Sequence, residues 1–177
     1  MKRLFLAATA ASLLVACSVP RQAKEGGALP GQHVDPTQLL LAIKDGQEQG
    51  EPVAAGSGQG LVDALRRSLA AHQVPLSATP DMVLEQGFAD AERGGFTYVL
   101  KGTITHWEHN ATAWSGKGDK LNISTELYDV RSRTLVAAAT DKRTATGFTL
   151  VSGTPDRFMD EVANGALSQI YGWPIKN

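Results

Sequence analysis

The chain has 177 residues, a formal net charge of −1 and 42% hydrophobic side chains, which is enough for one folded domain with a single core. Without Lys2 and Arg3, 15 basic side chains stand against 18 acidic ones. This balance argues against nucleic acid as the main partner, because such binding requires clustered positive charge. Cys17 is the only cysteine, so the folded domain is expected to rely on its core rather than on a disulfide.

The N-terminal residues have the pattern of an export signal. Lys2 and Arg3 precede an uncharged apolar run, Leu4 to Val15, which is shorter than the roughly 20 apolar residues of a membrane-spanning helix. A short apolar run after a basic start is typical of a secretory signal peptide. We therefore predict that residues 1–16 are a signal peptide.

The run ends in Leu14-Val15-Ala16-Cys17, which resembles the lipobox of bacterial lipoproteins. The resemblance implies cleavage before Cys17 and lipidation of its thiol, so that acyl chains attach the mature protein to a membrane. Ser18 follows the cysteine, where inner-membrane lipoproteins usually carry Asp. By this resemblance the expected location is the outer membrane, facing the periplasm.

Residues 18–36 are rich in glycine and proline and contain almost no apolar side chains. A segment of this composition cannot bury an apolar face. We predict that residues 17–36 comprise the lipidated Cys17 and a flexible tether, and that residues 37–177 form a single periplasmic domain.

The first half of that domain alternates short apolar runs with helical patterns. Leu39 to Ile43 predicts a buried strand, and Ser57 is expected to cap a helix that runs to about His72. Val74 to Ala78 predicts a second strand. Thr79-Pro80-Asp81 then predicts the start of a second helix, which Gly94-Gly95 ends.

From Phe96 the apolar period changes to two, which predicts three strands. The residues expected to share a face are Tyr98, Leu100, Gly102 and Ile104 in the first strand, Leu121, Ile123, Thr125 and Leu127 in the second, and Leu135, Ala137 and Ala139 in the third. Asp129 to Thr134 predicts a hairpin connection. Thr154-Pro155-Asp156 predicts a final helix, whose stripe Phe158, Val162, Ala166 and Ile170 is expected to dock on the sheet.

The predicted order is strand, helix, strand, helix, three strands and a helix. A strand-helix-strand unit favours parallel pairing, and consecutive strands favour an antiparallel meander. We therefore predict an α+β domain with a single mixed β-sheet of about five strands and helices packed on it.

One cluster has side chains of the kind that bind metals, His106-Trp107-Glu108-His109. In a strand His106 and Glu108 share a face and His109 turns away, and the spacing is not that of zinc hydrolases. We expect a solvated strand end here, with no metal and no other cofactor. The glycine-rich loop Gly56 to Gly60 lacks a Walker lysine, and no Gly-x-Ser-x-Gly motif is present, so no enzymatic activity is predicted.

The segment Trp107 to Lys117 contains two of the three tryptophans. Either both rings fold back over the sheet edge, or at least one is exposed to anchor a partner or to stack on a sugar. The candidate interaction surface comprises Trp107, Glu108, Trp114 and Lys117.

His106-Trp107-Glu108 and Thr112-Ala113-Trp114-Ser115-Gly116-Lys117, together with the lipobox, resemble an uncharacterised domain-of-unknown-function family of small Gram-negative lipoproteins. The resemblance implies a location and a fold but no reaction. At the level of fold alone, the pattern is similar to the N-terminal domain of TolB and to LpoB, which bind proteins.

The predicted function is a non-enzymatic, outer-membrane-anchored module that binds another protein of the cell envelope. The alternative is a lipoprotein that recognises glycan or lipid through Trp107–Lys117. A hydrolase or metal site is the third reading.

Overall fold

The computed structural model describes residues 23–28, 39–44, 54–79, 83–109, 118–145 and 154–174. Its strands are β1 (Ala23–Ala28), β2 (Leu39–Lys44), β3 (Leu76–Thr79), β4 (Tyr98–Glu108), β5 (Lys120–Asp129) and β6 (Leu135–Thr144). Its helices are α1 (Ser57–Ala71), α2 (Leu84–Gly94) and α3 (Met159–Tyr171), the last preceded by the 3₁₀ turn η1 (Pro155–Phe158).

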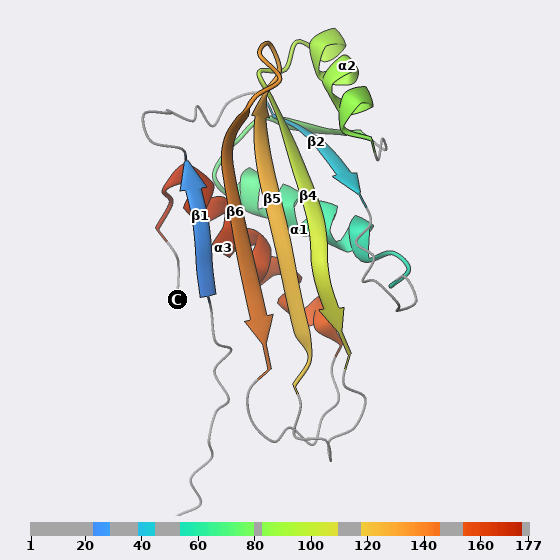
Figure 1. Cartoon of the computed structure of the whole chain (residues 1–177), viewed down its shortest axis with the longest axis vertical. Coiled ribbons are helices and arrows are strands. Elements are labelled where there is room, and N and C mark those ends of the chain that lie inside the picture. Colours follow the sequence, from blue (N-terminus) through green and yellow to red (C-terminus); the bar gives the residue numbers. More distant parts are fainter. Residues whose placement is uncertain are drawn as a thin grey trace, which may run out of the picture.

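The strands form one mixed sheet in the order β1-β6-β5-β4-β2-β3 (Figure 1). β2 pairs in parallel with β3 and β4, whereas β4, β5, β6 and β1 pair antiparallel. This arrangement confirms the predicted α+β class with a single mixed sheet. The described strands number six, one more than the sequence indicated.

The crossovers place α1 and α2 on opposite faces of the sheet. The chain moves outward from β2 to β3 through α1, and returns past β2 to β4 through α2. Parallel crossovers are right-handed, so two crossovers in opposite directions put their helices on opposite faces. α2 accordingly packs on Val99 and Tyr128, whose sheet neighbours Leu100 and Leu127 belong to the other face.

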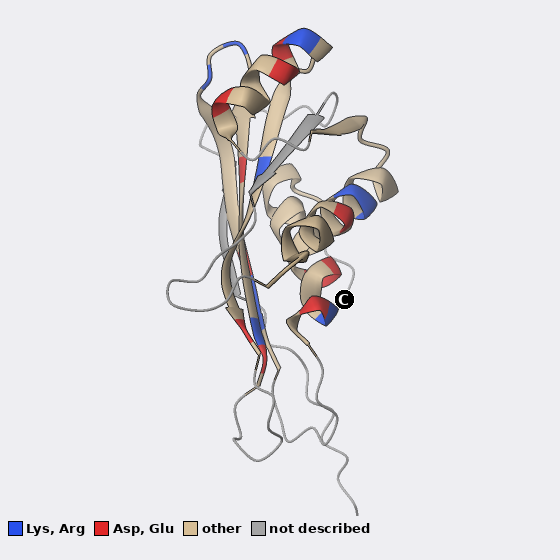
Figure 2. Ribbon diagram, turned by 90° about the vertical axis from the view of Figure 1, so that its right-hand side faces the viewer, with Lys and Arg blue, Asp and Glu red and all other residues tan. Residues whose placement is uncertain are grey.

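The main core lies between the sheet and the pair α1 and α3, which both lie behind the sheet in Figure 1 and on one side of it in Figure 2. The predicted final stripe is confirmed, since Phe158, Val162, Ala166 and Ile170 are all buried. The predicted inward residues of β4 and β5 also lie in this core or are buried beside it. At Gly102 an added Cβ would lie 3.0 Å from Leu65 and 3.2 Å from Leu61, so the missing side chain lets α1 approach β4 closely.

Two predicted helix starts are wrong in detail. Ser57 is the first residue of α1 rather than its cap, which is Gly56 with a φ of 83°, and the Ser57 hydroxyl is buried without a hydrogen-bond partner among the described residues. Thr79 ends β3, and its hydroxyl donates to Asp90. α2 begins only at Leu84, after Val83. In both places the capping pattern of the sequence does not coincide with the first residue and cap of the helix.

Leu135 also departs from the prediction. The register between β5 and β6 shifts after Leu127, so that Leu135 pairs with Tyr128 rather than continuing the face of Ala137. Because side chains alternate along a strand, this shift moves Leu135 to the other face. Its side chain is 38% exposed.

The segment predicted as a tether contains β1, which pairs antiparallel with β6 from Ala23 opposite Lys142 to Ala28 opposite Ala137. The expectation of a wholly flexible segment over residues 17–36 is therefore corrected for these six residues. An edge strand is held by backbone hydrogen bonds to its neighbour, so it can form without the apolar pattern that the prediction relied on.

Candidate functional site

The predicted interaction segment begins at a β-bulge in β4. Ile104 pairs with Ile123 and His106 pairs with Asn122, which leaves Thr105 as the additional residue. A bulge exchanges the faces of all residues that follow it. Without the bulge, Trp107 would lie on the face opposite Ile104; with it, Trp107 pairs with Leu121 and joins the core face.

Trp107 is accordingly half-buried and packs against the main core. Of the two alternatives left open by the sequence, folding back over the sheet is the one that holds for this residue. Trp114 and Lys117 lie outside the described residues. The structure therefore leaves their part of the candidate surface untested.

The bulge also turns His106 and Glu108 to the face away from α1 and α3. The Glu108 carboxylate accepts a hydrogen bond from Lys120 Nζ at 2.7 Å and lies 3.2 Å from His106 Nε2. His109 is exposed beyond the strand end. No group of three potential metal ligands occurs within the described ranges.

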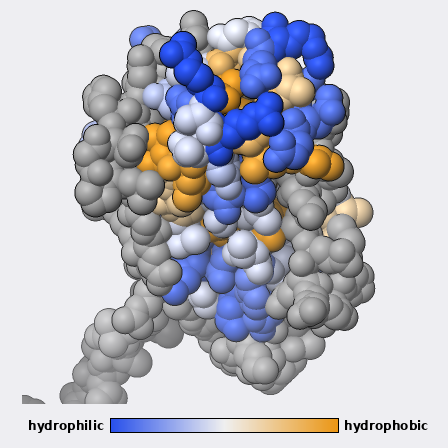
Figure 3. Space-filling model, turned by 45° about the horizontal axis from the view of Figure 1, so that its top comes forward, coloured by the Kyte–Doolittle hydropathy of each residue, from blue (hydrophilic) through white to orange (hydrophobic). Residues whose placement is uncertain are grey.

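This second face of the sheet, here called the open face, continues with further polar side chains. Lys101 Nζ donates to Glu126 at 2.8 Å, and the Tyr128 hydroxyl donates to the same carboxylate oxygen at 2.8 Å. Figure 3, which looks obliquely from the end that carries α2, shows mainly hydrophilic atoms with hydrophobic ones in small separate groups. α2 covers Val99 on this face, and away from α2 the open face carries polar side chains whose charges are paired between β4 and β5.

Within this network the ionisations of Glu126 and Tyr128 are coupled. Burial alone would raise the pKa of Glu126, but hydrogen bonds from Lys101 and Tyr128 and the charge of Lys101 hold it below its usual 4.5. Burial, followed by the hydrogen bond to the Glu126 carboxylate and its charge, raises the pKa of Tyr128 to about 12. The shared carboxylate therefore stabilises the protonated phenol.

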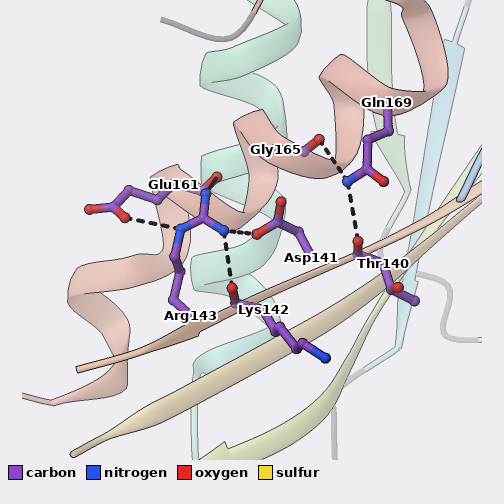
Figure 4. Close-up of polar contacts among 7 residues, drawn as sticks. All are labelled: Thr140, Asp141, Lys142, Arg143, Glu161, Gly165 and Gln169. Atoms are coloured by element: carbon purple, nitrogen blue, oxygen red, sulfur yellow. Dashed lines mark hydrogen bonds and ion pairs between the residues drawn. The ribbon is translucent and has the colours of Figure 1, made fainter. Parts of the chain in front are cut away.

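A second polar cluster, shown in Figure 4, is buried between β6 and α3. Arg143 pairs with Asp141, and its side chain also donates to the Glu161 carboxylate and to the Glu161 backbone oxygen, each at 3.1 Å. The side chains of Arg143 and Asp141 are 6% and 0% exposed. Arg157, from η1, donates to the buried Asp119 at 3.0 Å. The pair Arg143–Glu161 connects β6 to the start of α3, and the pair Arg157–Asp119 connects η1 to the residue before β5.

Sequence reasoning missed this cluster, although a signal was available. Asp141 and Arg143 continue the inward period of Ala137 and Ala139, and opposite charges two residues apart on a core-facing strand indicate a buried pair. A ring stack was also missed, in which Trp173 lies against His72 at 3.7 Å and Tyr171 at 4.6 Å between ring centroids. It joins the ends of α1 and α3, which no local pattern brings together.

No family model matches the chain, and no curated protein matches it. Among solved structures, it is similar to a PelC variant from Paraburkholderia phytofirmans described as a dodecamer, with a TM-score of 0.61, 19% identity and coverage of 87% of this chain and 98% of that chain.

Two other solved structures share the fold. Protein XCC0632 from Xanthomonas campestris, described with the DUF330 family, has a TM-score of 0.51 and 15% identity over 80% of this chain and 94% of its own. Lipoprotein GNA1162 from Neisseria meningitidis has a TM-score of 0.51 and 11% identity over 73% and 96%. These likenesses show the fold, which occurs in at least one lipoprotein and in a domain-of-unknown-function protein. The remote likeness to TolB and LpoB stays a prediction. None of the described helices is both long and apolar enough to cross a bilayer.

Replacing Trp107 by alanine is expected to lower the free energy of unfolding by roughly 2–4 kcal/mol, somewhat below the range for fully buried aromatic residues. Urea unfolding of the mature domain measures this loss. Thr105→Ser, at the exposed bulge, is the matched control and should change stability by less than about 0.5 kcal/mol. A loss below about 1 kcal/mol for Trp107→Ala would contradict the inward orientation of the indole.

Tyr128 should titrate near pH 12, and Glu126→Gln should return its pKa towards the ordinary value of 10 because the acceptor loses its charge. Because the folded-state pKa is raised, the associated stability is present below pH 10 and is lost as the pH rises from about 10 to about 12. Near-ultraviolet absorbance of the phenolate gives the pKa, and Tyr128→Phe assigns the transition. An unchanged titration in Glu126→Gln would contradict the coupling.

Proposed function

We propose that the protein is a cell-envelope lipoprotein, anchored through Cys17 in the outer membrane and facing the periplasm, and that it acts without catalysis as a protein-binding module. The observation that carries the proposal is the lipobox-like segment Leu14–Cys17, together with a fold that is similar to the Neisseria meningitidis lipoprotein and to PelC over almost the whole length of each of those chains.

The first partner that we propose is another copy of the same chain. The similar PelC crystals are described as dodecamers, so this fold can form assemblies of identical subunits. Identical subunits that contact one another through two different patches form a closed ring when the rotation between them closes. A ring would also anchor many lipid chains together, which strengthens membrane attachment without new contacts.

Within the candidate interaction surface, Trp114 and Lys117 are the residues that we propose contact the partner protein. Trp107 packs on the core and Glu108 pairs with Lys120, which weakens the alternative of a glycan or lipid site that uses both tryptophans. Aromatic residues are enriched at the centres of protein interfaces, and the rims of interfaces are polar. Trp114 remains the candidate anchor.

Cys17→Ser is expected to abolish incorporation of labelled fatty acid and to leave the protein unprocessed or released from the membrane, because the thiol that accepts the lipid is lost. Metabolic labelling and separation of inner from outer membranes measure this. Ser18→Asp is a matched variant that keeps lipidation and should shift the protein to the inner membrane. Normal labelling of Cys17→Ser would contradict the lipoprotein proposal.

Trp114→Ala is expected to reduce self-assembly and recovery of envelope partners while changing the free energy of unfolding by less than about 1 kcal/mol, as for an exposed residue. Light scattering of the detergent-solubilised lipoprotein gives the assembly mass, and affinity purification from solubilised envelopes gives partner recovery. A stability loss of about 3–5 kcal/mol would instead identify Trp114 as a core residue. Unchanged mass and recovery would contradict its role as an anchor.

A further inference from the structure

The two edges of the sheet are β1 and β3, the first and the last strand in its order. β1 pairs with β6 and β3 pairs with β2, so each has a second side on which the described part of the chain supplies no strand. Backbone N–H and C=O groups along such a side can bind a further strand. Figure 1 shows β1 as the outer strand at the left of the sheet.

β3 is open on both of its faces. Ser77 and Ala78 are adjacent in the strand, so their side chains point to opposite faces, yet both are exposed. β3 also contains no charged residue, whereas charged side chains are a usual means of keeping edge strands apart. Pro75 and Pro80 flank the strand and have no N–H to donate. A partner strand can therefore pair along the whole of Leu76–Thr79, but not far beyond it.

The strand pairings place the uncharged part of β1 on the same rows of the sheet as β3. Followed across the paired strands, the row of Ala78 contains Leu41, Leu100, Leu127, Ala137 and Ala28. The next row joins Thr79 to Gly27 in the same way. The charged residues of β1, Lys24 and Glu25, belong to rows beyond the end of β3. Copies placed side by side without displacement along the strands would therefore bring the uncharged parts of the two edges together.

We infer that β3 of one copy pairs antiparallel with β1 of the next copy, with Ala78 opposite Ala28. This inference rests on the self-assembly proposed above and adds a strand contact to it. β1 and β3 run in opposite directions within one copy, so neighbours in the same orientation meet antiparallel, the slightly more stable arrangement. The contact joins two different patches, so it can repeat from copy to copy.

A second copy satisfies this surface more fully than a strand of another protein does. Pairing between copies fills both edges of each sheet, whereas a single strand from another protein fills one edge and leaves the other open. The rows shared by β3 and β1 are few, so one contact alone is weak. An assembly in which each copy is held at both edges gains from every additional contact, because the later contacts form within the assembly.

Disulfide crosslinking tests the contact. The sheet order leaves five strand spacings between β1 and β3 of one copy, about 24 Å, whereas a disulfide joins Cα atoms at most roughly 7 Å apart. Ala78→Cys and Ala28→Cys in one chain can therefore form a bridge only between copies. Cys17 is the only cysteine, and lipidation occupies its thiol, so the detergent-solubilised full-length lipoprotein offers only the two introduced thiols.

Mild oxidation of this double variant is expected to give trimers and longer crosslinked chains on non-reducing gels. Each single variant can give at most a dimer, because a chain needs two thiols in every copy to grow. The matched control combines Ala78→Cys with Ala23→Cys, at the other end of β1 and roughly 17 Å from Ala28. It should form at least about fivefold fewer chains, because its thiols lie outside disulfide reach.

Light scattering before oxidation separates failure of this contact from failure of self-assembly. An assembly that gives no crosslinked chains, or gives as many in the Ala23→Cys control, would overturn the pairing of β3 with β1 and leave self-assembly standing. A monomer without crosslinked chains would overturn both. In intact cells, a bridge from Ala78→Cys to a different envelope protein would assign the β3 edge to that protein and would also overturn the inference.

Discussion

Packing of α1 and α3 on a single face of the sheet is the constraint on which the rest of the molecule depends. Fully buried leucines from α1, β4 and β5 meet in this layer, and their burial outweighs local sequence preferences at the element ends. Because strand side chains alternate, the residues between these apolar positions lie on the other face, where Val99 packs under α2 and Lys101 and Glu126 pair with each other.

The bulge at Thr105 shows how one additional residue changes the candidate surface. The sequence pattern of β4 continues past Ile104, and the same alternation would put His106 towards the core and Trp107 outside it. The bulge reverses both assignments, so that the large aromatic ring covers the core and the titratable groups face solvent. The cost is one unpaired residue in the ladder, which is smaller than that of burying an imidazole without partners.

Much of the fold could be read from apolar periodicity, and the misses have specific causes. The stripe from Phe158 to Ile170 and the alternation of Leu121 to Leu127 were readable because many residues repeat one pattern. β1 could not be predicted from apolar periodicity, because a strand that is held by backbone pairing needs no apolar repeat. The bulge at Thr105 and the register shift beside Leu135 each depend on a neighbouring strand. For the candidate site, the sequence located the segment but could not orient Trp107 within it.

β1 pairs with the edge of β6, and this limits how copies of the domain can meet. By pairing with β6, β1 occupies the edge that would otherwise offer free backbone groups beside Ala137 to Lys142. β1 therefore replaces β6 as the edge strand on this side of the sheet. The edges that remain are β3 and the outer side of β1. In one copy these two strands run in opposite directions, so a head-to-tail neighbour that joined them would pair antiparallel. Copies related by rotation about an axis along the strands keep a common strand direction, which is the geometry that such lateral pairing requires. The two edges of the described sheet are therefore suited to repeat one contact from copy to copy.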